Sequence, residues 1–499
     1  MASRSATSRV EQWGLYELAL RGPAGGNPFL DVRFGGIFRQ GHREVAVEGF
    51  YDGGGLYKVR FSPDTQGDWT CTTTSNVKAL GGRKARLTVA RPRRGNHGPV
   101  KVWRGRAFAY ADGTRYYPFG TTCYAWPHQD PAVVRQTLST LKTAPFNKMR
   151  MCVFPKSYTF NKNEPPRYPY VHTGPMPDEP AKSKPGDWRW DFTQFDPDYF
   201  RHFEWCVGQL LKLGIEADII LFHPYDRWGF RQLDPPADER YLHYAVARLG
   251  AYRNVWWSLA NEWDLMKSQT EEGFDRFGRL IQTIDPYRRL MGNHNCHRFY
   301  DPSRPWITHV SAQGDTEGVP GWLAVYGKPV IVDETRYEGN VENGWGNITG
   351  REMSHRFWEG TAAGGYVGHG ETYYNEQHLL WWAKGGRLIG QSPARIAFLR
   401  KIMQDGPAEF LEPVLQRGNR GLYLKNKYYL FYFGDGQPSW RDLELEGGPY
   451  RCEVIDTWKM TIKPVKGSFQ GKCRLDLATR PCMAARFTAV AGGHGAQAR

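Results

Sequence analysis

Between about residue 99 and residue 408 the sequence alternates short β-rich runs with longer amphipathic helical patterns. Helical patterns lie between most of the runs, for example at Pro131–Lys142, Pro197–Leu213 and Glu271–Ile284. Such repetition favours an α/β fold with a (β/α)8 TIM barrel over an open sheet, which normally has fewer strands and a glycine-rich phosphate loop. The eight runs that predict strands are Tyr117–Tyr124, Asn147–Phe154, Ile215–Phe222, Val255–Asn261, Leu290–Asn295, Ile307–Gly314, Val330–Thr335 and Tyr366–Tyr373.

On both sides of the predicted barrel the apolar residues alternate with a period of two. Runs such as Glu44–Glu48 and Leu56–Phe61 are separated by turn residues, which is typical of antiparallel strands. Similar runs return at Tyr428–Phe433 and Cys452–Asp456. We therefore expect an N-terminal Ig-like β-sandwich over residues 1–98, a barrel over 99–408, a C-terminal β-sandwich over 409–490 and a flexible tail over 491–499.

Composition excludes several other classes. The chain has 499 residues, of which 40% are hydrophobic and 23% charged, so it is globular, and no run approaches the roughly 20 apolar residues that span a bilayer. Eight cysteines are too sparse for a disulfide framework. Because the N-terminus lacks the apolar core of a secretory signal, the sequence predicts a cytoplasmic protein with reduced cysteines.

The formal net charge of +15 raises the question of a nucleic-acid partner. The densest basic run, Arg83–Arg94, lies where a strand leaves the first domain, and a solvated interdomain face explains it. We expect no nucleic-acid partner, no membrane association and no cofactor; a homo-oligomer is compatible with the sequence. His294–His297 offers soft metal ligands but lacks the distant partners of a tetrahedral zinc site, so no metal is predicted.

Two carboxylates end predicted strands of the barrel. Asn261 and Glu262 follow the fourth strand, and Glu334 ends the seventh. Catalytic groups of TIM barrels come from the C-terminal ends of strands, so these side chains are expected to converge at the barrel mouth. Two carboxylates about 5 Å apart carry retaining glycoside hydrolysis. The alternative to a catalytic role, for each glutamate taken alone, is a side chain at a strand end that contacts only solvent or an arginine.

Other polar and aromatic residues near strand ends are candidates for substrate binding. Each also has a structural explanation: an internal ion pair for Arg150, a packed histidine for His223, and core packing for single tryptophans. The remaining candidates are Asp226, Ser311, Gln313, Glu371, Trp126 and Trp263, with Trp228 and Trp345 as further aromatic residues.

A long insertion, Pro155–Asp196, follows the second predicted strand. On a barrel this loop lies over the active-site face, and its aromatic residues predict a lid or subsite wall that favours removal of terminal sugars. The alternative is a surface loop that packs on the N-terminal sandwich. The aromatic residues concerned are Tyr158, Tyr168, Tyr170, Trp188 and Trp190.

The Asn-Glu pair after strand four and the Glu after strand seven resemble the clan A glycoside hydrolases, in which Glu262 would correspond to the acid/base and Glu334 to the nucleophile. Further segments make the chain similar to the apiosidase-like glycoside hydrolases, whose barrels often follow a β-sandwich. These segments are Phe50–Gly54, Tyr57–Pro63, Tyr117–Gly120, Asn147–Arg150, Gly364–Tyr366 and His369–Thr372.

Together with the paired carboxylates, the resemblance implies a retaining glycosidase, and the rim expected from the insertion favours exo action. Its expected substrates are oligosaccharides or glycoconjugates with terminal sugars, including pentofuranosides such as apiose or arabinose. It also implies that Arg150 lies beside the nucleophile. The rival hypothesis is a non-catalytic carbohydrate-binding protein on a degenerate barrel, and the two carboxylates argue against it.

Overall fold

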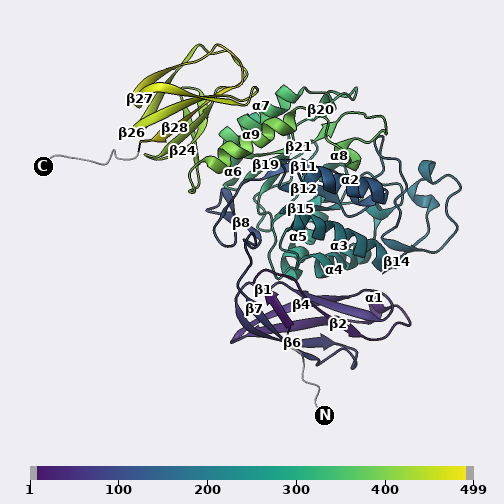
Figure 1. Ribbon diagram of the computed structural model, residues 1–499. Coiled ribbons are helices and arrows are strands. Elements are labelled where there is room, and N and C mark those ends of the chain that lie inside the picture. The colour runs from purple at the N-terminus through teal and green to yellow at the C-terminus, as the bar shows by residue number, and fades with distance from the viewer. Residues whose placement is uncertain (1–7, 491–499) are drawn as a thin grey trace.

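The computed structural model describes residues 8–490, and it consists of a barrel with a β-domain at each end (Figure 1). The N-terminal β-domain lies on one side of the barrel and the C-terminal β-domain packs on the opposite side. The predicted tail, residues 491–499, lies outside the described residues.

The barrel sheet has the strand order β17-β16-β15-β12-β11-β21-β19-β18, and all its pairings are parallel. The first and last strands of this order are neighbours, since the amide of Thr308, two residues before β18, donates to the carbonyl of Met291 in β17 at 2.8 Å. The predicted TIM barrel is thus confirmed. Its strands are β11 (Phe119–Thr122), β12 (Lys148–Cys152), β15 (Glu216–Phe222), β16 (Val255–Ala260), β17 (Met291–Gly292), β18 (Val310–Gln313), β19 (Val330–Glu334) and β21 (Tyr366–His369).

The helices around the barrel, with the exception of the short α8, begin at side-chain caps or prolines. Asp196, Asp234, Thr270 and Thr349 each accept a backbone N–H of the first turn, which satisfies donors that a helix leaves unpaired. The connection from β17 to β18, all of it described, contains no helix. The helices are α2 (Pro131–Leu141), α3 (Pro197–Lys212), α4 (Pro235–Leu249), α5 (Glu271–Ile284), α6 (Val319–Tyr326), α7 (Gly350–Ala362), α8 (Trp381–Lys384) and α9 (Ser392–Asp405).

The N-terminal domain is a bent seven-stranded sheet of order β1-β7-β6-β3-β4-β5-β2. Strand β4 pairs with β3 through its first part and with β5 through its last residues, so the sheet folds over a core that contains Phe38, Val59 and Trp69. Its strands are β1 (Ser8–Glu11), β2 (Tyr16–Arg21), β3 (Phe34–Gln40), β4 (Arg43–Tyr51), β5 (Leu56–Phe61), β6 (Gly67–Ser75) and β7 (Lys84–Ala90), with the short helix α1 (Pro28–Asp31).

A buried ion network joins this domain to the barrel. Arg60 contacts Glu204 at 2.6 Å, and Arg248 contacts both Glu204 at 2.6 Å and Asp52 at 2.9 Å. Arg60 and Asp52 belong to the N-terminal domain, whereas Glu204 and Arg248 lie on α3 and α4. A small sheet of β8 (Val100–Trp103), β9 (Ala107–Tyr110) and β10 (Arg115–Tyr116) then leads the chain into the barrel.

The C-terminal domain is an antiparallel sheet of order β23-β24-β25-β28-β26-β27. One face of β25 packs against α7 and α9 through residues such as Leu430, and the other face contributes Phe431 to a separate core. Its strands are β23 (Glu412–Gln416), β24 (Asn419–Leu424), β25 (Tyr428–Tyr432), β26 (Trp440–Asp456), β27 (Thr461–Asp476) and β28 (Met483–Ala489).

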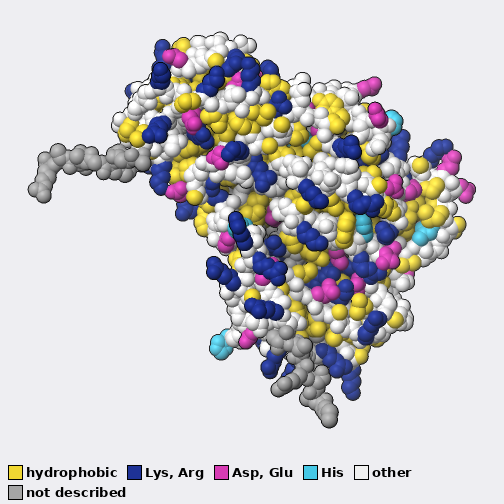
Figure 2. All heavy atoms as spheres, in the orientation of Figure 1, with side chains coloured by type: hydrophobic (Ala, Val, Ile, Leu, Met, Phe, Trp, Pro, Cys, Tyr) yellow, Lys and Arg dark blue, Asp and Glu magenta, His cyan; other side chains and the backbone are white. Residues whose placement is uncertain are grey.

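Three global expectations can be compared with the structure. All eight cysteines lie within residues 8–490, and all are unpaired. In the same part of the chain, no helix combines the length and apolar character needed to cross a membrane. On the face drawn in Figure 2, lysine and arginine side chains are scattered over all three parts of the molecule, with acidic side chains between them.

Candidate active site

A cavity of about 540 Å³ opens at the C-terminal ends of the barrel strands. This volume lies within the range of small-molecule sites. Of the predicted site residues, Glu262, Glu334, Gln313 and Trp345 line it. Tyr158, Cys296 and His297 also line it, and the sequence analysis named them for other roles. It did not single out further lining residues, among which are Tyr124, Lys156, Phe160, Tyr225, Tyr337 and Trp382.

Glu262 follows the last residue of β16 and is 7% exposed. Its backbone has a φ of 54°, in the left-handed region that a non-glycine residue rarely occupies and that often marks functional sites. The Tyr225 hydroxyl and the Asn261 side-chain amide, the latter at 3.1 Å, both donate to Oε2 of Glu262. The carboxyl group is therefore fixed at the cavity wall.

Glu334 is the last residue of β19, and its Oε1 faces three groups. The Tyr124 hydroxyl donates to it, Arg150 Nη1 lies at 3.2 Å, and His294 Nε2 lies at 3.8 Å. Burial lowers the pKa of His294 to about 3, so this imidazole is neutral near pH 7. The permanent positive charge next to Glu334 is therefore that of Arg150.

Asn261 links the two carboxyl groups. Its Oδ1 accepts from Arg150 Nη2 at 3.1 Å and lies 3.1 Å from the Tyr124 hydroxyl oxygen, while its amide nitrogen donates to Glu262. Tyr124 and Arg150 also contact Glu334, so one amide group connects the environments of both carboxyl groups. The amide orientation that this arrangement uses satisfies every polar atom of the Asn261 side chain.

The two carboxyl groups differ in their proton affinity. Burial, and then the negative charge of Glu334, raise the pKa of Glu262. Burial also acts to raise the pKa of Glu334, but the Arg150 guanidinium and the Tyr124 hydroxyl outweigh it and hold this pKa below the ordinary value, since the neutral His294 carries no charge. Opposite shifts in a pair of neighbouring carboxyl groups distinguish a proton donor from an ionised partner.

Below the cavity, charged residues alternate through the barrel interior. Lys148 contacts Asp218 at 2.5 Å and Asp333 at 2.8 Å, and Arg150 Nε lies 3.7 Å from Asp218. The Ser311 hydroxyl donates to Asp333 at 2.6 Å. Ser311 therefore supports this interior network and lies outside the cavity lining, which corrects its expected contact with substrate.

Several other predicted binding residues are also used internally. His223 Nε2 is bonded to the Phe154 carbonyl at 3.1 Å, and Asp226 accepts from the amides of Trp228, Gly229 and Arg231. Trp126, Trp228 and Trp263 are buried outside the cavity lining, and Trp263 donates to the Arg298 carbonyl. These positions correct the expected sugar contacts, because turn formation and core packing already occupy the side chains.

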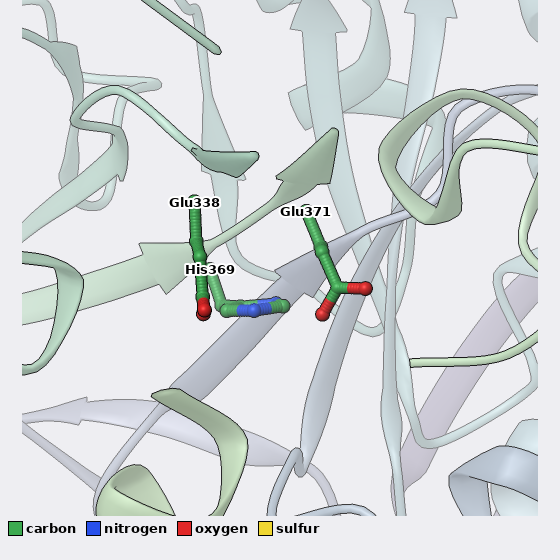
Figure 3. A group of neighbouring side chains, drawn as sticks. All are labelled: Glu338, His369 and Glu371. Atoms are coloured by element: carbon green, nitrogen blue, oxygen red, sulfur yellow. The ribbon is translucent and has the colours of Figure 1, made fainter. Parts of the chain in front are cut away.

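Glu371 forms a buried cluster with Glu338 and His369, in which the imidazole lies between the two carboxyl groups (Figure 3). Glu371 accepts from the amides of Ile389 and Gly390, while Glu338 accepts from those of the next two residues, Gln391 and Ser392. The two carboxyl groups thus hold the N-terminus of α9, and the expected substrate contact of Glu371 is corrected to this structural one. The three residue types are also metal ligands, but four backbone amides already donate to the oxygens of both carboxyl groups.

The insertion that follows β12 has two parts. Residues 156 and 158–160 line the cavity, so the first part forms a wall of the site. The second part, with β13 (Tyr170–His172) and β14 (Trp190–Phe195), packs its aromatic residues on the barrel loops, and Asn27 of the N-terminal domain donates to Thr193 at 2.7 Å. Of the five aromatic residues expected at the rim, Tyr158 lines the cavity, whereas Tyr168, Tyr170, Trp188 and Trp190 pack elsewhere.

Comparisons with known proteins agree with this architecture. Residues 103–404 match the family described as "Apiosidase-like, catalytic domain", and residues 9–76 and 418–488 match two domains of unknown function, DUF5060 and DUF5605. A search of curated proteins found no match.

Among solved structures, a candidate glycoside hydrolase from Bacteroides vulgatus ATCC 8482 is 37% identical, with a TM-score of 0.92 over 97% of this chain and 100% of that chain. A glycoside hydrolase family 5 protein from the same organism is 15% identical, with a TM-score of 0.60 over 81% of this chain and 96% of that chain, and it shows the shared fold. The family match covers more than half of the sequence, and the 37% identical relative is covered over its whole length. The chain therefore belongs to the apiosidase-like glycoside hydrolases.

Proposed function

We propose that the protein is a retaining glycosidase in which Glu262 is the acid/base and Glu334 the nucleophile. The observation that carries this proposal is the opposite environment of two carboxyl groups on one cavity. Glu262 is buried beside another carboxylate, which favours its protonated form, whereas Glu334 accepts from Arg150 and Tyr124, which favours its ionised form.

In the first step Glu334 attacks the anomeric carbon while the Glu262 proton passes to the glycosidic oxygen, so that the bond to the leaving group breaks and a glycosyl ester forms. In the second step Glu262 accepts a proton from water, and the resulting nucleophile releases the sugar from Glu334. The acid/base is then protonated again and the nucleophile is again ionised. The configuration at the anomeric carbon is retained after two inversions.

We further propose that the enzyme removes terminal sugars. The cavity is bounded by Phe160 from the insertion, by Trp345, and by Trp382 on α8, and these aromatic side chains contact one another. Aromatic faces of this kind stack on the apolar faces of sugars. The family description supports apiosides as the first substrates to test, and arabinosides are the next pentofuranosides in the screen.

Variants of the two glutamates test the assignment. On an aryl glycoside with a good leaving group, Glu262→Ala should keep measurable turnover and be accelerated by azide, giving a glycosyl azide of retained configuration. Glu334→Ala should lose about 10⁴-fold or more, and azide should give the inverted product. Proton NMR of the first sugar anomer released by the unaltered enzyme should show retention.

Three results would contradict the proposal. An inverted first product would remove Glu334 as nucleophile, and full activity of Glu334→Ala would do the same. If the unaltered protein binds glycans but cleaves none in a screen of aryl pentosides and hexosides, the non-catalytic alternative would replace the enzyme.

A further inference from the structure

Lys156 places a buried amino group in the wall of the proposed catalytic cavity. Burial lowers the pKa of this group, whereas the nearby Cys152, Glu262 and Glu334 act to keep it protonated. Lys156 follows β12 by four residues, is 1% exposed and lines the cavity. Within residues 8–490 no carboxylate oxygen lies within 4 Å of its ammonium. The ammonium lies instead over aromatic rings, with Nζ 3.4 Å from the ring centre of Tyr124, 4.2 Å from that of Tyr225 and 4.7 Å from that of Tyr158.

The two nearest rings have matching roles. Tyr124 donates its hydroxyl to Glu334, and Tyr225 donates its hydroxyl to Glu262. The ammonium therefore lies over both phenols that hold the two proposed catalytic carboxyl groups. Within the described residues, no other lysine lies over the ring of Tyr124 or Tyr225.

A cation over a phenol ring has two effects with the same sign. It attracts electron density toward the ring face, which makes the hydroxyl a stronger hydrogen-bond donor. Its field also stabilises negative charge on nearby carboxylates directly. Both effects favour the ionised carboxylate. In agreement, Lys156 acts to lower the pKa of both Glu262 and Glu334, although burial and Glu334 keep the former raised.

We propose, on the basis of the proposed function, that Lys156 is a positioning residue that acts through Tyr124 and Tyr225 on both catalytic carboxyl groups and thereby sets the pH range of the enzyme. Removing its charge strengthens the hold of both carboxyl groups on their protons. The ionised nucleophile and the protonated acid/base then both occur at higher pH. The other charged or titratable groups that act on these carboxyl groups are Arg150, His294, Cys296 and Tyr337, and Lys148 and Asp333 act on His294 beneath them. Cys152, Arg150 and His223 also face Lys156.

The test is the pH dependence of kcat/KM for Lys156→Met, Lys156→Arg and the unaltered enzyme on a neutral aryl glycoside. In Lys156→Met both limbs of the profile should move to higher pH by about one unit, the size expected for one nearby charge at a protein-like dielectric constant. Lys156→Arg keeps the charge and should restore both limbs. Lys162→Met, at an exposed lysine of the same loop, is the matched control and should leave the profile unchanged.

Three outcomes would overturn the proposal. Limbs that stay in place in Lys156→Met, with a lower rate at every pH, would reduce Lys156 to a packing role. A higher KM confined to substrates with a carboxylate or sulfate would make it a substrate-binding residue. Movement of only one limb would show that Lys156 acts on one of the two carboxyl groups, which contradicts the proposed action on both. Lys156→Gln provides the same comparison if circular dichroism shows that the Met variant is unfolded.

These failures differ from a failure of the proposed function. That failure would appear in the unaltered enzyme, either as no cleavage or as an inverted first product. The Lys156 experiment begins only with a bell-shaped profile of the unaltered enzyme, whose limbs then serve as the reference.

Discussion

The hydroxyl group of Tyr124 donates a hydrogen bond to the proposed nucleophile, and Tyr124→Phe removes this group while keeping the ring. The ring is fully buried and packs against Trp382, and it remains under the Lys156 ammonium. The lost contacts are the hydrogen bond to Glu334 Oε1 and the 3.1 Å contact with Asn261 Oδ1. The substitution therefore tests one interaction without opening a large cavity.

Its magnitude follows from the charge of the acceptor. A hydrogen bond to a charged group contributes about 1.5–3 kcal/mol, and one pKa unit corresponds to about 1.4 kcal/mol. The hydroxyl favours the ionised carboxylate, so its removal should raise the pKa of Glu334 by about 1–2 units. The acidic limb of kcat/KM should move to higher pH by the same amount. At a pH below the original limb, activity should fall by roughly 10- to 100-fold.

The assay is kcat/KM of an aryl glycoside between pH 3 and 9, with thermal unfolding as a check on the fold. Tyr225→Phe is the matched control, because it removes the equivalent hydroxyl from Glu262 and should move the alkaline limb instead. An acidic limb that is unchanged in Tyr124→Phe, or one that moves equally in Tyr225→Phe, would refute the assignment of Glu334 as the group that must be ionised.

Three further predictions concern stability and the insertion. Arg248→Met should lower the unfolding free energy by about 1.5–3 kcal/mol, because Glu204 and Asp52 each lose one charged hydrogen-bond partner while Arg60 and Lys58 remain. Arg279→Met at an exposed ion pair should cost under about 1 kcal/mol, and urea unfolding compares the two variants. Replacing residues 175–182, which lie outside the cavity lining, with a short Gly-Ser turn should leave KM unchanged. Phe160→Ala, at a residue that lines the cavity, should raise KM several-fold. Equal effects of the two changes in steady-state kinetics would show that the whole insertion shapes the site. Burial lowers the pKa of five histidines to about 3, so they stay neutral in the folded protein but take up protons near pH 6.5 when it unfolds; they are His128, His223, His294, His309 and His369. The free energy of unfolding should therefore be unaffected by them above pH 6.5 and should fall below it by up to about 1.4 kcal/mol per pH unit for each histidine. A melting temperature that stays constant between pH 7 and 5 would contradict this.

The periodic part of the fold could be predicted from the sequence because strands and helices each bury one repeating set of side chains. The helical pattern at Glu271–Ile284 coincides with α5, and the run Val330–Thr335 ends one residue beyond β19. The helix α6 was missed, because its eight residues include Pro320 and Gly321 and its apolar residues show no clear period. The fifth predicted strand, Leu290–Asn295, is shorter in the structure, where β17 comprises Met291–Gly292 and a loop without a helix follows.

The sequence by itself determined the barrel, the flanking β-domains and the two strand-end glutamates, because strand periodicity and the rule that catalytic groups follow strands depend on local order along the chain. Only the tertiary structure decided which neighbours face the glutamates. Tyr124, Lys156 and Tyr225 lie in different loops and meet at the cavity, whereas His223, Asp226, Ser311 and Glu371 also follow strands but turn to internal partners. The physical reason is that a polar side chain at a strand end bonds to whichever partner the loops bring near it, and those loops are placed by long-range packing that no local pattern encodes.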